Sequence, residues 1–138
     1  MEKLTIYTHG ACSEDPGPAA IGVYVVNSKE EVVLSLSESI GNGTNDYAEY
    51  FAVVRALQAV KEKFGDQVMD MNLDLKSSST LVINNLSAKE QLMNVSLIGH
   101  FMEIFNMRVA SFPHLQPSLV KSNLNKEAIN LAQAKLNN

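Results

Sequence analysis

The chain has 138 residues, of which 46% are hydrophobic and 19% are charged, and its formal net charge is −4. This length and composition exclude a disordered protein and predict a single domain over residues 1–138 with a buried core. One cysteine excludes an internal disulfide framework, and no apolar run is long enough for a secretory signal or a membrane span, so we expect a cytoplasmic protein with no membrane partner.

Three strands are predicted in the first third of the chain. Residues 4–8 alternate in polarity as a half-buried strand does, and two β-rich runs follow at 21–26 and 32–36. The polar residues 27–30 are short enough to join the second and third strands as an antiparallel hairpin. The Pro-Gly-Pro run at 16–18 stiffens the loop before the second strand.

A helix and a fourth strand come next. Apolar residues recur at three- and four-residue steps from about residue 45 to 64, which predicts a helix that Gly65 ends. Residues 69–75 are predicted as a strand. The apolar side chains expected on one face of that strand are Met71, Leu73 and Leu75.

Two further helices are predicted in the region that follows. A short helix over residues 81–86 is opened by Ser79 or Thr80. A longer helix covers residues 95–107. The side chains expected to face inward from it are Leu97, Ile98, Phe101, Met102, Ile104 and Phe105.

The last third of the chain predicts an edge strand and a terminal helix. Any strand within residues 112–120 must lie at a sheet edge, because Pro113 and Pro117 cannot donate to a central ladder. Asn125 is expected to cap a final helix. The order of elements predicts an α/β fold, a mixed sheet with helices packed against it.

Four segments share a pattern that occurs in the same order in one known family. They read LTIYTHGAC followed by DPGPAAIG, then TNDYAE, SSSTLVIN and VKSNLNKEAINLA. Together they cover nearly the whole chain and resemble the ribonuclease H family of type 1, including the reverse-transcriptase-like domains. The resemblance implies a ribonuclease H-like fold with a five-stranded mixed sheet flanked by helices.

The resemblance also implies where the family's chemistry would lie. Family members use four carboxylates to hold two Mg²⁺ ions, one activating water and the other stabilising the leaving oxygen of an RNA phosphate. Carried over position by position, these sites are His9, Glu49, Ser78 and Ile129. Only Glu49 is an acid, and magnesium requires hard oxygen ligands.

Neighbouring acids are not expected to replace the missing ligands. Asp74 precedes Ser78 by four residues on a strand, which is roughly 13 Å. Glu127 lies two residues before Ile129 on a helix and points to the opposite side. We therefore expect no cofactor where the family would use Mg²⁺ or Mn²⁺, and a degenerate active site in which Glu49 is the only retained catalytic acid.

Substrate contacts implied by the resemblance are partly retained. The candidate substrate-binding residues are Cys12, Asp15, Gly17, Thr44, Asn45 and Lys121. Asp15 and Asp46 stand where the family has asparagine, so each is expected to place a negative charge against substrate phosphates. Lys121 stands for an arginine and loses bidentate geometry. The acidic net charge also argues against tight nucleic-acid binding.

Three functions stay open from the sequence. The first is a catalytically inactive ribonuclease H-like module that binds an RNA–DNA hybrid, RNA or a protein partner weakly. The second is an active Mg²⁺- or Mn²⁺-dependent endoribonuclease that cleaves RNA in RNA–DNA hybrids. The third is a purely regulatory domain that binds proteins. The sequence does not indicate the oligomeric state.

Overall fold

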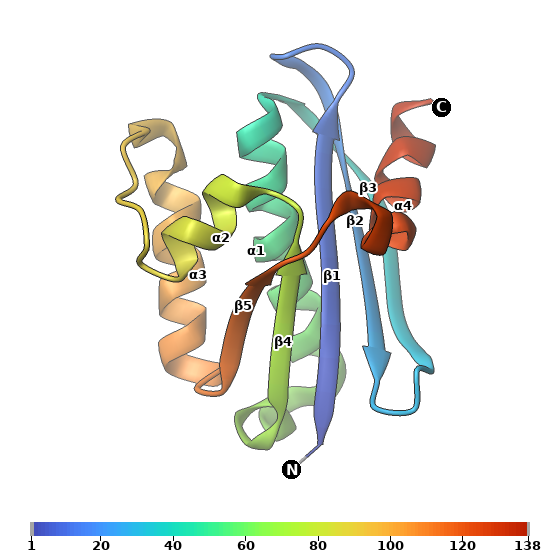
Figure 1. The fold of residues 1–138 in the computed structure, drawn as a ribbon, viewed down its shortest axis with the longest axis vertical. Helices are drawn as coiled ribbons and strands as arrows, with labels where there is room; N and C mark the ends of the chain where they lie inside the picture. The colour runs from blue at the N-terminus through green and yellow to red at the C-terminus, as the bar shows by residue number, and fades with distance from the viewer. Residues whose placement is uncertain (1, 138) are drawn as a thin grey trace.

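A computed structural model describes residues 2–137 of the chain, which form one mixed sheet with helices on both faces (Figure 1). The strands are β1 (Lys3–Cys12), β2 (Gly17–Asn27), β3 (Val32–Gly43), β4 (Asn72–Ser77) and β5 (Leu115–Leu119). The α-helices are α1 (Asn45–Phe64), α2 (Thr80–Leu86), α3 (Ile98–Ser111) and α4 (Lys126–Leu136). The five-stranded α/β fold expected from the sequence is confirmed.

The sheet has the strand order β3-β2-β1-β4-β5. β1 is central, since it pairs with β2 antiparallel and with β4 parallel, and β5 joins β4 in parallel at one edge. Helices α1, α2 and α3 lie on one side of the sheet, and α4 packs on β1, β2 and β3 from the other side (Figure 1). The carboxyl ends of β1 and β4 therefore lie side by side, close to where α1 begins.

The second and third strands form the antiparallel hairpin that we predicted, and all three of the first strands are longer than expected. The Asn27 side chain closes the predicted hairpin by accepting the backbone N–H groups of Lys29 and Glu31 at 2.9 and 3.0 Å. β1 continues to Cys12, and β3 continues to Gly43, where it pairs with Gly17.

Helix α1 has the predicted bounds. The hydroxyl of Thr44 caps it by accepting the N–H of Tyr47 at 3.1 Å, and Gly65 ends it. The predicted start of the fourth strand was wrong, because a 3₁₀ helix over Gly65–Asp70 takes up its first residues. The three side chains expected on one face of that strand are buried, namely Met71, Leu73 and Leu75.

Helices α2 and α3 differ in how well they match expectation. Ser79 caps α2, as predicted, by accepting the N–H of Val82 at 3.2 Å. A 3₁₀ turn over Val95–Leu97 precedes α3, which ends at Ser111 rather than near 107. Of its expected inward residues, Leu97 and Ile104 are buried and Phe101 is half-buried. The expectation was wrong for three that are 44–50% exposed, namely Ile98, Met102 and Phe105.

The physical reason is that the six expected residues extend over more of α3 than its neighbours cover. The helix packs against α1 along a narrow stripe around Ile104, and the side that carries Phe105 is left open. Apolar periodicity shows that a helix has an apolar side, but it does not show how much of that side another element covers.

The end of the chain places β5 and α4. β5 is an edge strand, as its prolines predicted, and Pro117 lies opposite Leu75 in the parallel pair. Asn125 precedes α4 at the N-cap position but makes no side-chain cap hydrogen bond, so the predicted capping role is wrong. No helix within residues 2–137 is long and apolar enough to cross a membrane.

Candidate functional site

The end of β1 approaches the first turn of α1 so closely that only glycine fits at residue 10. A Cβ on Gly10 would lie 2.1 Å from both the carbonyl carbon and the carbonyl oxygen of Ala48. At this distance the backbone N–H of Gly10 donates to Oε1 of Glu49 at 2.8 Å. The glycine therefore brings the only acid among the four family-equivalent positions onto the central strand.

Glu49 is almost completely buried, with 5% of its surface exposed. Burial raises the pKa of its carboxyl group to about 7, and the hydrogen bond from Gly10 counteracts part of that rise. A carboxyl group with this pKa is only about half ionised near neutral pH. Glu49 is thus poorly suited to serve as a permanently charged metal ligand.

His9 lies beside Glu49 without forming a hydrogen bond to it. Its Nδ1 atom is 3.8 Å from Oε2 of Glu49, which is within ion-pair range but too long for a hydrogen bond. Burial lowers the pKa of His9 and raises that of Glu49, so both directions favour the neutral forms. Nδ1 is buried with no hydrogen-bond partner among residues 2–137. Both shifts weaken an ion pair, so His9 and Glu49 are in contact without a strong salt bridge between them.

Asn125 connects three parts of the site. Its side-chain amide, fully buried, donates to the backbone carbonyl of Thr8 at 2.9 Å and lies 3.5 Å from the hydroxyl of Ser78. It thus holds the start of α4 against the ends of β1 and β4. This role of Asn125 was not predicted from the sequence, where the only signal for it is that the segment 120–132 resembles a family segment with asparagine at this position.

Replacing Asn125 with alanine is expected to lower the free energy of unfolding by about 1–3 kcal/mol, because the buried Thr8 carbonyl loses its donor. Urea denaturation of the two proteins measures the difference. Asn130→Ala is the matched control, since Asn130 is exposed on the same helix. Equal losses in the two variants would contradict the role assigned to Asn125.

Ile129 and the neighbouring acids bring no further ligand to the site. Ile129 is half-buried in the first turns of α4, and its aliphatic side chain has no donor atom. Asp74 is engaged farther down β4, where its carboxylate accepts from Ser118 at 2.9 Å and pairs with Lys76 at 3.2 Å. Glu127 is exposed in α4.

The donor set does not fit the two Mg²⁺ ions that the family implies. Magnesium prefers octahedral coordination by oxygen, with charged carboxylates supplied by the protein. The four positions offer a neutral imidazole, a half-ionised carboxyl group, a hydroxyl and a hydrocarbon. Across the part of the chain that the structure describes, no group of three or more His, Cys, Asp and Glu side chains is placed to hold a metal ion.

A second cluster forms where the β1–β2 loop meets the start of α1. Five of the six candidate substrate-binding residues gather there, namely Cys12, Asp15, Gly17, Thr44 and Asn45. The thiol of Cys12 lies 3.9 Å from Oδ1 of Asn45, and Gly17 pairs with Gly43, the neighbour of Thr44. The sixth, Lys121, is exposed next to Val120, whose N–H donates to the carbonyl of Ser77.

Asp15 has a structural role that the sequence did not reveal. One of its carboxylate oxygens accepts the backbone N–H of Asn45 at 3.0 Å, where α1 begins. A carboxylate at a helix N-terminus is favourable, because the unpaired N–H groups carry partial positive charge. Asp46 is exposed in the same first turn. Two carboxylates thus lie at the N-terminus of α1.

The comparison with protein families gives one match. A family described as reverse transcriptase-like matches residues 7–135. Among curated relatives, a ribonuclease H of Chlorobium phaeovibrioides is 36% identical over 86 residues, which are 62% of this chain and 53% of that protein. A ribonuclease HI of Halobacterium salinarum is 36% identical over 85 residues, covering 62% of this chain and 40% of its own length. The matched region thus spans about half the length of these relatives.

Solved structures extend the similarity to the whole chain. LC11-RNase H1, isolated from compost by a metagenomic approach, has a TM-score of 0.93 at 30% identity and covers 99% of this chain and 97% of its own. The same enzyme in complex with RNA/DNA hybrid has a TM-score of 0.91 at 30% identity, with 95% and 94% covered. RNase H1 of Halobacterium salinarum has a TM-score of 0.89 at 27% identity, with 98% of both chains covered.

Proposed function

The chain belongs to the reverse transcriptase-like ribonuclease H family, and from this premise we propose that it binds RNA–DNA hybrid without cleaving it. The observation that carries the proposal is the donor set at His9, Glu49, Ser78 and Ile129. A two-metal reaction needs ionised oxygen ligands around both ions. Here three positions supply none, and the fourth is buried with a raised pKa.

The choice of partner rests on the fold and on the second cluster. LC11-RNase H1, which covers 95% of this chain at 30% identity, has been solved in complex with RNA/DNA hybrid. Thr44 and Asn45 are present at the start of α1, beside the loop that carries Gly17. Because Asp15 and Asp46 lie at the same place and the net charge is −4, we propose that binding is weak at physiological salt.

Cleavage of a labelled RNA–DNA hybrid in Mg²⁺ and in Mn²⁺ tests the absence of hydrolysis. No turnover above buffer is expected with either ion, and the variant Glu49→Ala is expected to give the same result. Turnover by the unmodified chain that Glu49→Ala abolishes would contradict the proposal. It would instead support the endonuclease hypothesis.

Hybrid binding is tested separately, by removing the two negative charges at the start of α1. The double variant Asp15→Asn and Asp46→Asn is expected to bind hybrid about 3–10-fold more tightly at low salt, because two negative charges no longer face the phosphates. The asparagine amide oxygen at position 15 can still accept the N–H of Asn45, so the loop stays in place. Fluorescence anisotropy over a salt series measures the change.

The matched control is Glu62→Gln with Asp70→Asn, which changes the net charge equally at exposed positions in the last turn of α1 and at the end of the 3₁₀ helix that follows it. The control is expected to leave affinity nearly unchanged. Equal gains from both double variants would show a net-charge effect and no defined binding surface. Undetectable hybrid binding even at low salt would contradict the proposed partner and favour the protein-binding hypothesis.

A further inference from the structure

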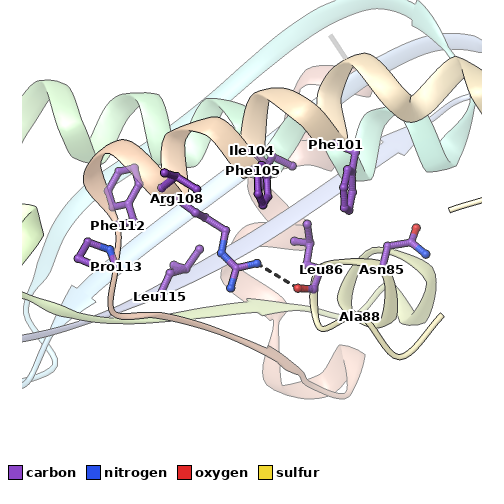
Figure 2. Close-up of a pocket in the computed structure, with 11 residues that line it drawn as sticks. Asn85, Leu86, Ala88, Phe101, Ile104, Phe105, Arg108, Phe112, Pro113 and Leu115 are labelled. Atoms are coloured by element: carbon purple, nitrogen blue, oxygen red, sulfur yellow. Dashed lines mark hydrogen bonds between the residues drawn. The ribbon is translucent and has the colours of Figure 1, made fainter. Parts of the chain in front are cut away.

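A second concave site lies on the side of the sheet that carries α2 and α3. None of its lining residues belongs to the proposed hybrid surface. It is a pocket of ≈ 390 Å³ between α3, the end of α2 and the segment that leads into β5 (Figure 2). Most of the side chains that line the pocket are hydrophobic, among them Leu86, Phe101, Phe105, Phe112 and Leu115. Pockets of this volume with apolar and aromatic walls are typical of small-molecule sites.

One charged side chain reaches into this apolar space. The side chain of Arg108 extends from α3 toward the end of α2, where Nη1 donates to the carbonyl of Leu86 at 3.0 Å (Figure 2). This bond uses one of the five N–H donors of the guanidinium. No carboxylate among residues 2–137 lies within salt-bridge distance of Arg108. Its charge is therefore half-buried without a counter-ion.

The other arginine of the chain, Arg55, differs from Arg108 because it has a carboxylate partner. Nε of Arg55 lies 3.0 Å from the carboxylate of Glu38, which neutralises it. Arg108 has no such partner, and burial lowers its pKa, because the charged form is partly removed from water. An anion that entered the pocket would meet a partly desolvated guanidinium with unused donors in a fork geometry that suits a carboxylate.

We propose that this pocket binds a small-molecule carboxylate with an apolar body. The carboxylate pairs with the guanidinium of Arg108, and the body lies among Phe101, Phe105 and Leu115. Charge complementarity selects an anion, and a volume of ≈ 390 Å³ suits a small molecule rather than a long peptide helix. Phe112 and Pro113 lie at one end of the pocket, where α3 leads into β5 (Figure 2). The site is independent of hybrid binding.

Octanoate is the probe, titrated into isotope-labelled protein and followed by NMR chemical shifts. Saturable shifts are expected at the end of α2, along α3 and at residues 112–115, with little change around Glu49. Octan-1-ol, which has the same apolar body without charge, is expected to bind about tenfold more weakly, since it lacks a charge-assisted pair. Octylammonium is expected to give no saturable shifts in the pocket.

Arg108→Met removes the charge and keeps an apolar stem. It is expected to weaken octanoate about tenfold and to leave octan-1-ol unchanged. Arg55→Met is the matched control and is expected to change neither affinity. If Arg108→Met does not fold, Val109→Glu serves instead, because Val109 is 70% exposed in the pocket lining and a carboxylate there should repel the probe.

Several outcomes would overturn the proposal. They are absence of pocket shifts with octanoate, equal affinity for octanoate and octan-1-ol, and octanoate binding that Arg108→Met or Val109→Glu leaves unchanged. Shifts of the same resonances with protein concentration alone would identify a second copy of the chain as the occupant and would overturn it too.

Discussion

Replacing Gly10 with alanine is expected to lower the free energy of unfolding by about 3 kcal/mol or more. The added Cβ would lie 2.1 Å from the backbone of Ala48, and backbone atoms cannot turn aside as a flexible side chain can. Either β1 or the first turn of α1 must move. Movement of either element breaks the 2.8 Å hydrogen bond from Gly10 to Glu49. The substitution is therefore expected to displace Glu49 as well as to disrupt the packing of β1 against α1.

Gly99→Ala is the control for this substitution. A Cβ on Gly99 meets no atom within 4 Å, and the residue lies in the first turn of α3. Alanine is expected to stabilise the protein there by roughly 0.5–1 kcal/mol, because glycine loses more backbone freedom in a helix. Urea denaturation of both variants measures the opposite signs. A Gly10→Ala protein as stable as the unmodified chain would show that β1 and α1 are not in close contact.

Glu49→Gln is expected to stabilise the protein at pH 8 and to leave stability nearly unchanged at pH 4, where Glu49 is protonated in both the folded and the unfolded state. Burial raises the pKa of Glu49 from 4.5 to about 7, so the folded state binds the proton more tightly than the unfolded state. The unmodified chain therefore loses stability as pH rises from about 4.5 to 7. At about 1.4 kcal/mol per pKa unit, the shift corresponds to roughly 3 kcal/mol, which is the gain expected from glutamine at pH 8.

The measurement is the unfolding free energy of both proteins at several pH values. His9 acts in the opposite direction, because its lowered pKa makes the fold less stable as pH falls below about 6.5. The difference between the two proteins removes most of that contribution. Glu62→Gln, at an exposed position of the same helix, is the control for the substitution itself. A difference curve independent of pH would mean that Glu49 is ionised in the fold.

Local patterns predicted most of the secondary structure. The alternating strands, the helix that Gly65 ends and the edge strand marked by prolines were predictable, because each depends on residues that are neighbours in the sequence. The start of β4 and the covered side of α3 depend on tertiary packing, so periodicity alone placed them wrongly.

The candidate site was accessible from the sequence only through the family resemblance. Nothing in the spacing of His9 and Glu49 indicates that a strand end and a helix turn meet within 3.8 Å. Asn125 shows the same limit, since an asparagine before a helix favours a local cap, whereas its partner carbonyl at Thr8 lies 117 residues away. Asp15 is exposed, as expected, but its carboxylate also accepts the backbone N–H of Asn45, which lies 30 residues away.

The bond between Asn125 and Thr8 has a consequence for the nascent chain. Domains fold largely as units while synthesis proceeds from the N-terminus. The first elements to leave the ribosome are β1, β2, β3 and α1. The Asn125 amide, which donates to the end of β1, emerges more than a hundred residues after Thr8. In a ribosome-bound intermediate, the carboxyl end of β1 around His9 would thus lack its hydrogen bond from Asn125. The site would take its final shape only late in translation.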